Sequence, residues 1–325
     1  MTARMPKVVV VGGSYVDMAI KCSRIPLPGQ IVAGSALSYT TDGPGPNQAA
    51  EAALCGCEVH LISKVGGDPF AQMVKDTLAA YKVNTDYIYT AEAKNTGIIV
   101  TLVDAEGENA VCTDSGANNA LLSQDIEAAE EVIAHADVCL IHGRLPQEAI
   151  VTTIRCGKLG RTKVILNPAR PIESRTETAQ PVGDLPIEYF SADILVANLY
   201  EAANIAEHAT TVTSRREMAK LIGSDLVARG LESAVVTMGK RGCMVIDRKG
   251  ADHIPAFEVE LVDQAGRGDA FAGALAAHYA TRHDVRQAVK FARAAGALAC
   301  TKFGALEAMP KKEEIIQLLQ TQEID

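Results

Sequence analysis

A glycine-rich turn that ends in an acidic residue stands at the start of a helix predicted over residues 269–280. The run Asp263-Gln-Ala-Gly-Arg-Gly-Asp269 follows an apolar stretch at 257–262. Gly266 and Gly268 let backbone N–H groups and the positive end of the helix dipole face one point, which makes an anion site. Asp269 there would be hard to protonate, yet it could accept the proton of an attacking hydroxyl. This combination favours phosphoryl transfer, and the alternative is a tight turn in which Asp269 only caps the helix.

Two glycine-containing segments near the beginning of the chain could contact a small polar molecule. Val11-Gly-Gly-Ser-Tyr-Val-Asp17 is a strand end that reaches an acidic side chain, and parallel sheets bind ligands at such ends. Asp42-Gly-Pro-Gly-Pro-Asn47 directly precedes a helix, where Asn47 could cap the helix or bond a hydroxyl group. Neither the Gly-x-Gly-x-x-Gly fingerprint nor the P-loop sequence occurs in the chain.

Two further segments place polar side chains directly after a predicted strand. Asn198 and Glu201 share one face of a helical turn, so they could hold a metal-bound water or a phosphate. A capping pair, in which Glu201 reaches back to the start of the helix, explains them equally well. Thr237-Met-Gly-Lys-Arg-Gly242 carries two cations in a glycine turn, which could serve a nucleotide or form a hairpin turn.

The composition is that of a globular enzyme-sized chain. With 325 residues, 48% hydrophobic and 22% charged, it can bury the core of one large α/β domain. A formal net charge of −9 argues against nucleic acids and anionic membranes as partners. No apolar run is long enough to cross a bilayer and no signal peptide is recognisable, so we expect a cytoplasmic location. The eight scattered cysteines indicate reduced thiols, and core packing explains Cys55, Cys57 and His60 better than a metal site.

Short β-rich runs alternate with helical runs along most of the chain, which predicts a mostly parallel sheet covered by helices. The predicted strands are 8–11, 59–63, 138–141, 164–166, 194–196 and 234–237, and the predicted helices are 48–54, 70–81, 123–134, 147–157, 214–229, 269–280, 284–302 and 311–321. Segments 31–40 and 96–113 alternate like exposed strands, and Asp104-Ala-Glu-Gly107 is a hairpin turn signal. They predict a small sheet that covers a site as a lid. Residues 170–187, with three prolines, form the one long predicted loop.

In their order and spacing, these motifs resemble those of the ribokinase-like (PfkB-type) carbohydrate kinase family, from residue 8 to residue 310. In that family the last turn usually reads Asp-Thr-x-Gly-Ala-Gly-Asp. The resemblance implies a three-layer α/β/α fold with a central, mostly parallel sheet and a small β lid, formed here by 14–41 and 96–113 of a single domain spanning 1–325. It also implies ATP and Mg²⁺, in many members K⁺, and a homodimer formed through the lid.

The resemblance assigns a role to each motif residue. Asp269 would be the catalytic base and Gly266, Arg267 and Gly268 the anion hole. The acceptor would be held by Asp17, Gly43, Asn47, Arg144 and Asp263, and ATP with its Mg²⁺ would be contacted by Asn167, Asn198, Glu201, Thr237, Gly239 and Gly242. Glu201 would order the Mg²⁺, and backbone oxygens around Asp263, Ala265 and the 303–305 loop would hold K⁺.

Several positions depart from the pattern of ribokinase, a member of this family. Ribokinase has Gly-Gly-Lys-Gly-Ala-Asn where this chain has Asp42-Gly-Pro-Gly-Pro-Asn47, so Pro44 replaces a lysine contact. Tyr15 stands in place of a sugar-binding Asn, and Arg144 falls at or beside a sugar-binding Glu. These departures argue against ribose itself and favour an acidic or strongly polar acceptor. Arg267 replaces a small residue in the anion hole, where it could bind the transferring phosphate or crowd it.

The leading hypothesis is ATP-dependent phosphorylation of a hydroxyl group, primary by expectation, of a sugar or sugar-derived small molecule. A nucleoside kinase of the same family is one alternative, although aromatic residues make up only 4% of the chain and tryptophan is absent. A non-catalytic ligand-binding or regulatory protein on the same scaffold is the other, suggested by Gln264 and Arg267 in the glycine turn.

Overall fold

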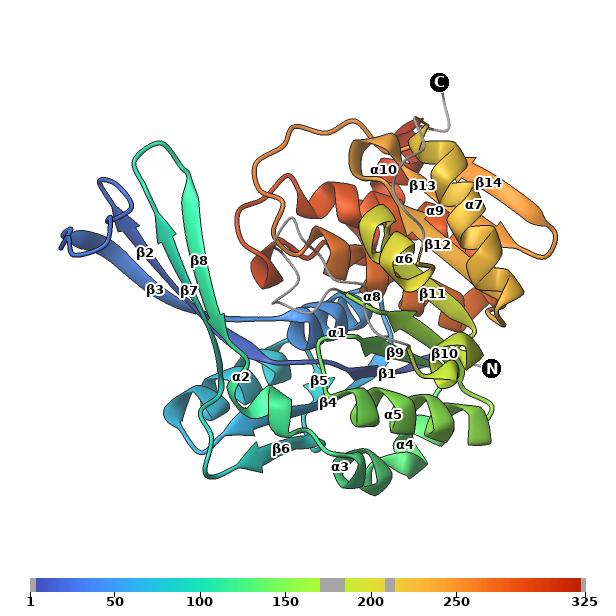
Figure 1. The fold of residues 1–325 in the computed structure, drawn as a ribbon, viewed down its shortest axis with the longest axis horizontal. Coiled ribbons are helices and arrows are strands. Elements are labelled where there is room, and N and C mark those ends of the chain that lie inside the picture. The colour runs from blue at the N-terminus through green and yellow to red at the C-terminus, as the bar shows by residue number, and fades with distance from the viewer. Residues whose placement is uncertain (1–3, 170–184, 208–213, 323–325) are drawn as a thin grey trace.

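The six predicted parallel strands lie side by side in one sheet of the computed structural model, which describes residues 4–169, 185–207 and 214–322. They are β1 (Lys7–Val11), β4 (Glu58–Gly66), β9 (Val138–His142), β10 (Lys163–Asn167), β11 (Ile194–Asn198) and β12 (Ser233–Thr237). The sheet order is β14-β13-β12-β11-β10-β9-β1-β4-β5, with β6 paired to β4 (Figure 1). The predicted order of strands is therefore confirmed, each strand being one to four residues longer than expected.

Four strands of this sheet carry no clear pattern in the sequence. They are β5 (Val83–Asn84), β6 (Ile88–Ala91), β13 (Cys243–Asp247) and β14 (Gly250–Ile254). The first two are very short, and β13 and β14 extend the sheet antiparallel to β12 and to each other. Because β12 and β13 are joined by the turn around Gly239 and Gly242, the hairpin interpretation of that segment is confirmed.

Helices cover both faces of the sheet, as predicted for a three-layer fold. One face packs against α1 (Pro44–Leu54), α2 (Pro69–Ala80), α8 (Arg267–Arg282), α9 (Val285–Ala299) and α10 (Lys312–Gln322); the other packs against α3 (Ser123–Ala128), α4 (Glu130–Ala134), α5 (Gln147–Leu159), α6 (Leu199–Ile205) and α7 (Arg215–Ala228). Side chains of β1 alternate between the two cores, Val8 and Val10 in one and Val9 and Val11 in the other. Both layers are therefore held by apolar burial on a sheet that is covered on both sides.

Two helices differ from the sequence prediction. The helix expected at 123–134 is divided at Ala129, whose φ of −104° and ψ of 9° leave the helical region. The helix expected at 48–54 begins at Pro44 instead, because a proline fits the first turn of a helix, where its missing N–H has no partner to lose. The described part of the chain also contains the short 3₁₀ helices η1 (Gly116–Ala120), η3 (Ile187–Ser191), η4 (Gly239–Arg241) and η5 (Leu306–Ala308).

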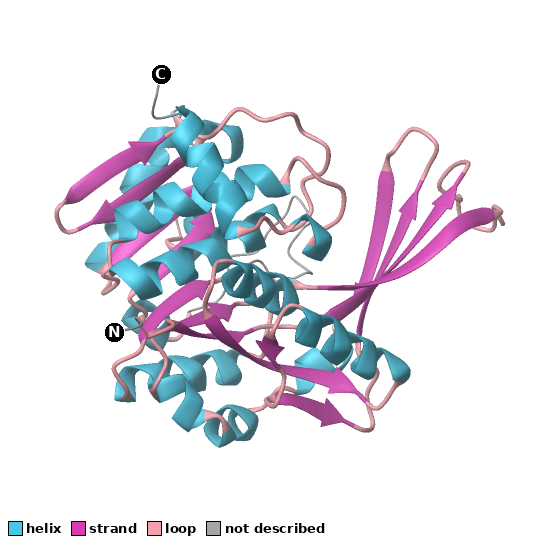
Figure 2. Cartoon of the chain, turned by 180° about the vertical axis from the view of Figure 1, so that it is seen from behind, coloured by secondary structure: helices cyan, strands magenta, loops and turns pink. Residues whose placement is uncertain are grey.

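A second, four-stranded sheet projects from the body beside the end of β1 (Figure 2). It consists of β2 (Tyr15–Cys22), β3 (Gly34–Asp42), β7 (Gly97–Val103) and β8 (Asn109–Asp114), in the order β3-β2-β7-β8. The predicted small sheet and the hairpin at 104–107 are confirmed, since Asp104 accepts hydrogen bonds from the N–H groups of Glu106 and Glu108. Strand β2 lies within the predicted lid segment 14–41 but was not predicted as a strand, and the strand expected at 31–40 is β3, which runs over 34–42.

Six of the eight cysteines are buried, in agreement with the prediction that core packing explains most of them. All eight cysteines are free thiols, and Cys55 and Cys57 are buried in the core beside α8 rather than in a metal site. Across 4–169, 185–207 and 214–322 there is no cluster of three His, Cys, Asp or Glu side chains suited to a metal ion. In the same ranges no helix has the length and hydropathy needed to cross a membrane. Most of the predicted long loop, residues 170–184, lies outside the described residues.

Candidate active site

A cavity of about 290 Å³ lies at the carboxyl ends of the parallel strands. The last residue of each of four adjacent strands lines it: His142 of β9, Asn167 of β10, Asn198 of β11 and Thr237 of β12. The order of the strands along the chain changes direction between the neighbouring strands β1 and β9. From β1 the sheet continues to β4 on one side, and from β9 it continues to β10 on the other side. Ligands of open α/β sheets bind at this reversal, outside the carboxyl ends of the strands.

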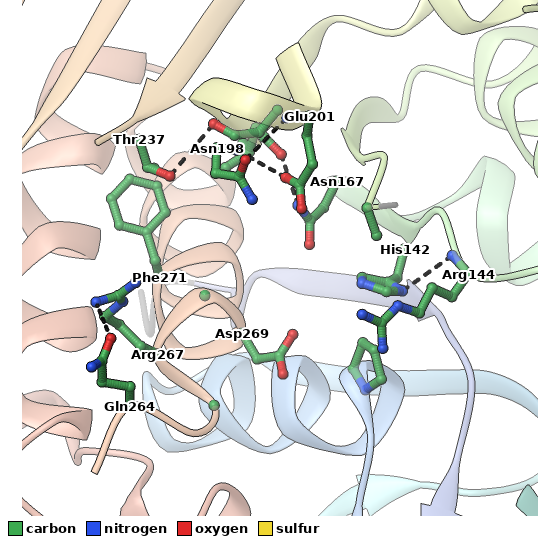
Figure 3. A pocket seen from close by; sticks show the side chains of 16 residues that line it. His142, Arg144, Asn167, Asn198, Glu201, Thr237, Gln264, Arg267, Asp269 and Phe271 are labelled. Atoms are coloured by element: carbon green, nitrogen blue, oxygen red, sulfur yellow. Dashed lines mark hydrogen bonds between the residues drawn. The ribbon is translucent and has the colours of Figure 1, made fainter. Parts of the chain in front are cut away.

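The start of α8 forms one wall of the cavity, and Asp269 points into it (Figure 3). Two amide side chains from α1 hold the carboxylate: Asn47 Nδ2 donates to Oδ2 at 3.1 Å and Gln48 Nε2 donates to Oδ1 at 2.9 Å. Gln48 Nε2 also donates to Asn167 Oδ1, while Asn167 Nδ2 donates to the carbonyl of Val196. This chain of bonds fixes the Asp269 carboxylate relative to the ends of two strands.

The pKa of Asp269 is raised from its ordinary value to about 6. Burial is the largest cause, since it penalises the charged form, and the nearby Asp42 carboxylate raises the pKa further. Hydrogen bonds from Asn47 and Gln48 and the charge of Arg144 act in the opposite direction. The expectation that Asp269 would be hard to protonate is therefore wrong, because desolvation is the largest influence on the carboxylate and raises its pKa. At neutral pH the group is still mostly a carboxylate and can act as a base.

The backbone at the start of α8 is open to the cavity. Gly266 is the N-cap residue in the left-handed conformation, with φ of +66°, and no side chain caps the helix. A Cβ on Gly266 would meet Met309 Cε at 2.8 Å, whereas a Cβ on Gly268 would meet no atom within 4 Å. The interpretation of Asp269 as a cap is thus wrong, because it is the third helical residue and bonds to α1. In this first turn the Arg267 N–H bonds to the Gln264 carbonyl at 3.5 Å, and the N–H groups of Gly268 and Asp269 are suited to an anion.

Asn198 and Glu201 form a capping pair, which is one of the two arrangements that the sequence predicted for them. Asn198 Oδ1 accepts from the N–H groups of Tyr200 and Glu201, each at 3.0 Å, and Glu201 Oε2 accepts from the Asn198 N–H at 2.9 Å. Both residues also line the cavity, above Asp269 in Figure 3. Capping therefore fixes two oxygen-bearing side chains at the cavity edge.

A larger cavity, of about 1150 Å³, adjoins the first one. The two share the residues Thr237, Gln264, Arg267, Gly268 and Phe271. The predicted residues Gly239 and Gly242 line the larger cavity, together with the cationic side chains Arg216, Lys240, Arg241 and Arg293. Arg267 stands at the boundary, where its guanidinium donates to Gln264 Oε1 at 3.2 Å. A larger cavity with several cationic side chains therefore adjoins a smaller one that contains Asp269.

Some predicted residues do not line either cavity. Asn47 lies behind Asp269 and does not cap α1, whose N-cap is Gly43. Asp17 accepts from Thr101 Oγ1 at 2.8 Å on the lid, and burial raises the pKa of Asp17. Asp263 accepts from the N–H groups of Ala265 and Gly304, which ties the 263–265 and 303–305 loops together.

Two residues of the site were missed by sequence reasoning. Gln48 is fully buried in α1, next to Asn47 in a helix that is otherwise rich in small residues, and only its polarity could have drawn notice. His142 follows directly after the predicted strand 138–141 and is 5% exposed. The same signal that marked Asn198 and Thr237, a polar residue at a strand end, applies to His142.

Comparison with known proteins gives consistent matches along the whole chain. The family model described as pfkB family carbohydrate kinase matches residues 5–312. A ribokinase of Staphylococcus aureus is 30% identical over 96% of this chain and 99% of its own, and a deoxyribokinase of Salmonella typhi is 28% identical over 97% and 99%. The crystal structure of Thermotoga maritima ribokinase aligns with a TM-score of 0.82 at 25% identity, covering 97% of this chain and 100% of its own.

One similar structure confirms the fold at lower identity. Arabidopsis thaliana ribokinase, solved as a complex with ribose and ATP, aligns with a TM-score of 0.84 at 22% identity, covering 98% of this chain and 99% of its own.

Proposed function

The chain belongs to the pfkB family of carbohydrate kinases, and from this premise we propose that it transfers the γ-phosphoryl group of ATP to a hydroxyl of a sugar or sugar-derived molecule bound beside Asp269. The observation that carries the proposal is the position of Asp269, partly buried and held by two amide donors at the first turn of α8. A base and an anion cradle within one helical turn are what in-line phosphoryl transfer to an alcohol requires.

In this mechanism Asp269 accepts the proton of the acceptor hydroxyl as that oxygen attacks phosphorus. Asn47 and Gln48 each donate to one oxygen of the carboxylate and so hold it in place at the cavity. Residues 266–268 would direct backbone N–H groups at the transferring phosphoryl group, where negative charge develops. The lid would exclude water, which is the competing acceptor. No covalent enzyme intermediate is needed.

The nucleotide and its metal would occupy the side of the site away from the lid. Thr237, Gly239 and Gly242 border the larger cavity, whose cations suit a polyphosphate. Asn198 and Glu201 have oxygen ligands of the kind that Mg²⁺ or its waters prefer, and the bound ion would supply charge neutralisation for the phosphates. K⁺ would lie among the backbone oxygens of the 263–265 and 303–305 loops, which Asp263 joins.

We expect a homodimer and a cytoplasmic location. Leu37, Val100 and Val111 leave apolar side chains exposed on the lid strands, which favours a homodimer formed through the lid. A cytoplasmic location is supported by the eight unpaired cysteines.

The test is ATP-dependent product formation over a panel of sugars, sugar acids and nucleosides, detected as phosphorylated acceptor. Asp269→Asn should lower kcat by roughly 100-fold or more while the fold is retained, because a positioned base contributes that much. Asp284→Asn is the matched control, since Asp284 caps α9 far from the cavity and asparagine also caps helices. Phosphorylation of nucleosides alone would assign a nucleoside kinase, and no product with any acceptor would favour a binding protein. Near-normal turnover of Asp269→Asn would refute Asp269 as the base.

A further inference from the structure

The two arginines of the smaller cavity lie at opposite ends of it. Arg267 lines both cavities and bonds to Gln264, so it belongs to the end that joins the larger, nucleotide-sized cavity. Arg144 and His142 line only the smaller cavity. In Figure 3 the Asp269 carboxylate stands between the two ends, with Arg267 on one side and Arg144 and His142 on the other. Whatever Arg144 contacts is therefore on the acceptor side of the base.

The Arg144 guanidinium has no protein counter-ion in the described part of the chain. Its backbone N–H donates to His142 Nδ1 at 3.3 Å, but no side-chain hydrogen bond or ion pair joins it to a described residue. The guanidinium is close enough to lower the pKa of both Asp269 and His142, yet Asp269 is not within ion-pair distance. Its planar fork of N–H donors is thus available to a ligand in the cavity.

His142 supplies a second donor at the same end. Burial, aided by the charge of Arg144, lowers the pKa of His142 to about 3, so the imidazole is neutral near neutral pH. Because Nδ1 accepts the Arg144 N–H, the ring proton resides on Nε2. The imidazole reaches into the cavity beside the guanidinium in Figure 3. A cation and a neutral N–H donor therefore face the same region.

The acidic groups near the site are engaged elsewhere. Asp42 Oδ1 accepts from the Gly43 N–H and from Asn47 Nδ2, and Asp17 is bonded to Thr101 on the lid. These carboxylates suit hydroxyl groups of an acceptor on the lid side. At the Arg144 end, by contrast, no acidic side chain is hydrogen-bonded to the donors in the described structure.

We infer that the acceptor carries a carboxylate, bound by the Arg144 fork and His142 Nε2, with its reacting hydroxyl directed at Asp269. This inference rests on the proposed kinase function and narrows its substrate class to sugar acids. A monoanion matches one cation and one neutral donor, whereas the second charge of a phosphate monoester would be left near Asp269 and Asp42 without a partner.

The experiment compares matched pairs of neutral sugar and acid, D-ribose with D-ribonate and D-glucose with D-gluconate, and includes ribose 5-phosphate. For the wild-type protein, kcat/KM should be about 10- to 100-fold higher for the acid of a pair, the range of a charge-assisted hydrogen bond. Arg144→Gln should lower the acid-to-neutral ratio towards one, and Arg144→Lys, which keeps the charge without the fork, should give an intermediate ratio. His142→Gln, which keeps a donor, should retain more of the ratio than His142→Leu.

Arg155→Gln is the control, because Arg155 is an exposed arginine on α5 that pairs with Glu188 outside the cavity. A second readout without ATP measures how far each acid and each neutral sugar raises the melting temperature of wild-type and Arg144→Gln proteins. The inference is overturned if the wild type prefers neutral sugars or ribose 5-phosphate, or if Arg144→Gln leaves the ratio and the acid-induced stabilisation unaltered. A pH profile that shifts equally for all acceptors would show that Arg144 only tunes Asp269. If the inference is overturned but neutral sugars are phosphorylated, the kinase function is retained. If acids bind and stabilise the protein but no acceptor is phosphorylated, only the kinase function is refuted.

Discussion

Replacing Gln48 with leucine should move the acid limb of the pH–rate profile to higher pH. Gln48 is fully buried, and its Nε2 donates to Asp269 Oδ1 at 2.9 Å, a bond that favours the charged carboxylate. A hydrogen bond to a charged group contributes about 1.5 kcal/mol or more, and one pH unit corresponds to about 1.4 kcal/mol. Since Asp269 has a pKa of about 6 in the wild type, leucine should raise the midpoint of the limb by about one pH unit.

The sign follows from the role of Asp269 as a base. Only the unprotonated carboxylate accepts the hydroxyl proton, so kcat/KM falls as the pH drops through the pKa, and the variant should lose activity first. The assay is kcat/KM for the acceptor across about pH 5 to 9 with direct product detection, because coupling enzymes have pH limits of their own. Gln72→Leu is the control, since Gln72 bonds to Asp76 on the exposed side of α2. A folded Gln48→Leu protein with an unshifted acid limb would refute the argument that this bond tunes Asp269.

Three further substitutions test other parts of the site. Asp269→Asn should become more stable relative to wild type as the pH rises from about 4 to about 7, by up to roughly 3 kcal/mol. The reason is that the wild type must ionise a partly buried group whose pKa is raised to about 6. The same difference in melting temperature between variant and wild type at both pH values would contradict this. Glu201→Gln keeps an oxygen that can accept from the Asn198 N–H, so stability should be nearly unchanged while the Mg²⁺ requirement rises, and an unchanged Mg²⁺ titration would mean that Glu201 only caps α6. Arg267→Ala should slow turnover roughly 10-fold or more with every acceptor, since its guanidinium lies at the nucleotide end; an effect that depends on the acceptor would place it elsewhere.

The sequence by itself determined the order of the elements and the local geometry of the motifs. Alternating β-rich and helical runs predicted the six parallel strands, since most residues of these strands are buried and apolar. The turn at 104–107 and the glycine turn at Gly266 could be found because turn chemistry depends on a few adjacent residues. Strands β5 and β6 lacked such a signal, because two- and four-residue strands are defined by their partners rather than by their own pattern.

Only the tertiary structure decided which side chains meet at the site and what charge they carry. Gln48 and Asp269 are 221 positions apart, and nothing near either residue predicts their hydrogen bond. The pKa of Asp269 depends on burial and on groups from α1 and from the end of β9, so the local helix start alone gave the wrong direction. The separation of Arg144 from Arg267 likewise arises because β9 and α8 reach the cavity from opposite sides. Desolvation and long-range charge are properties of the assembled fold, and these two decide how the motif residues act.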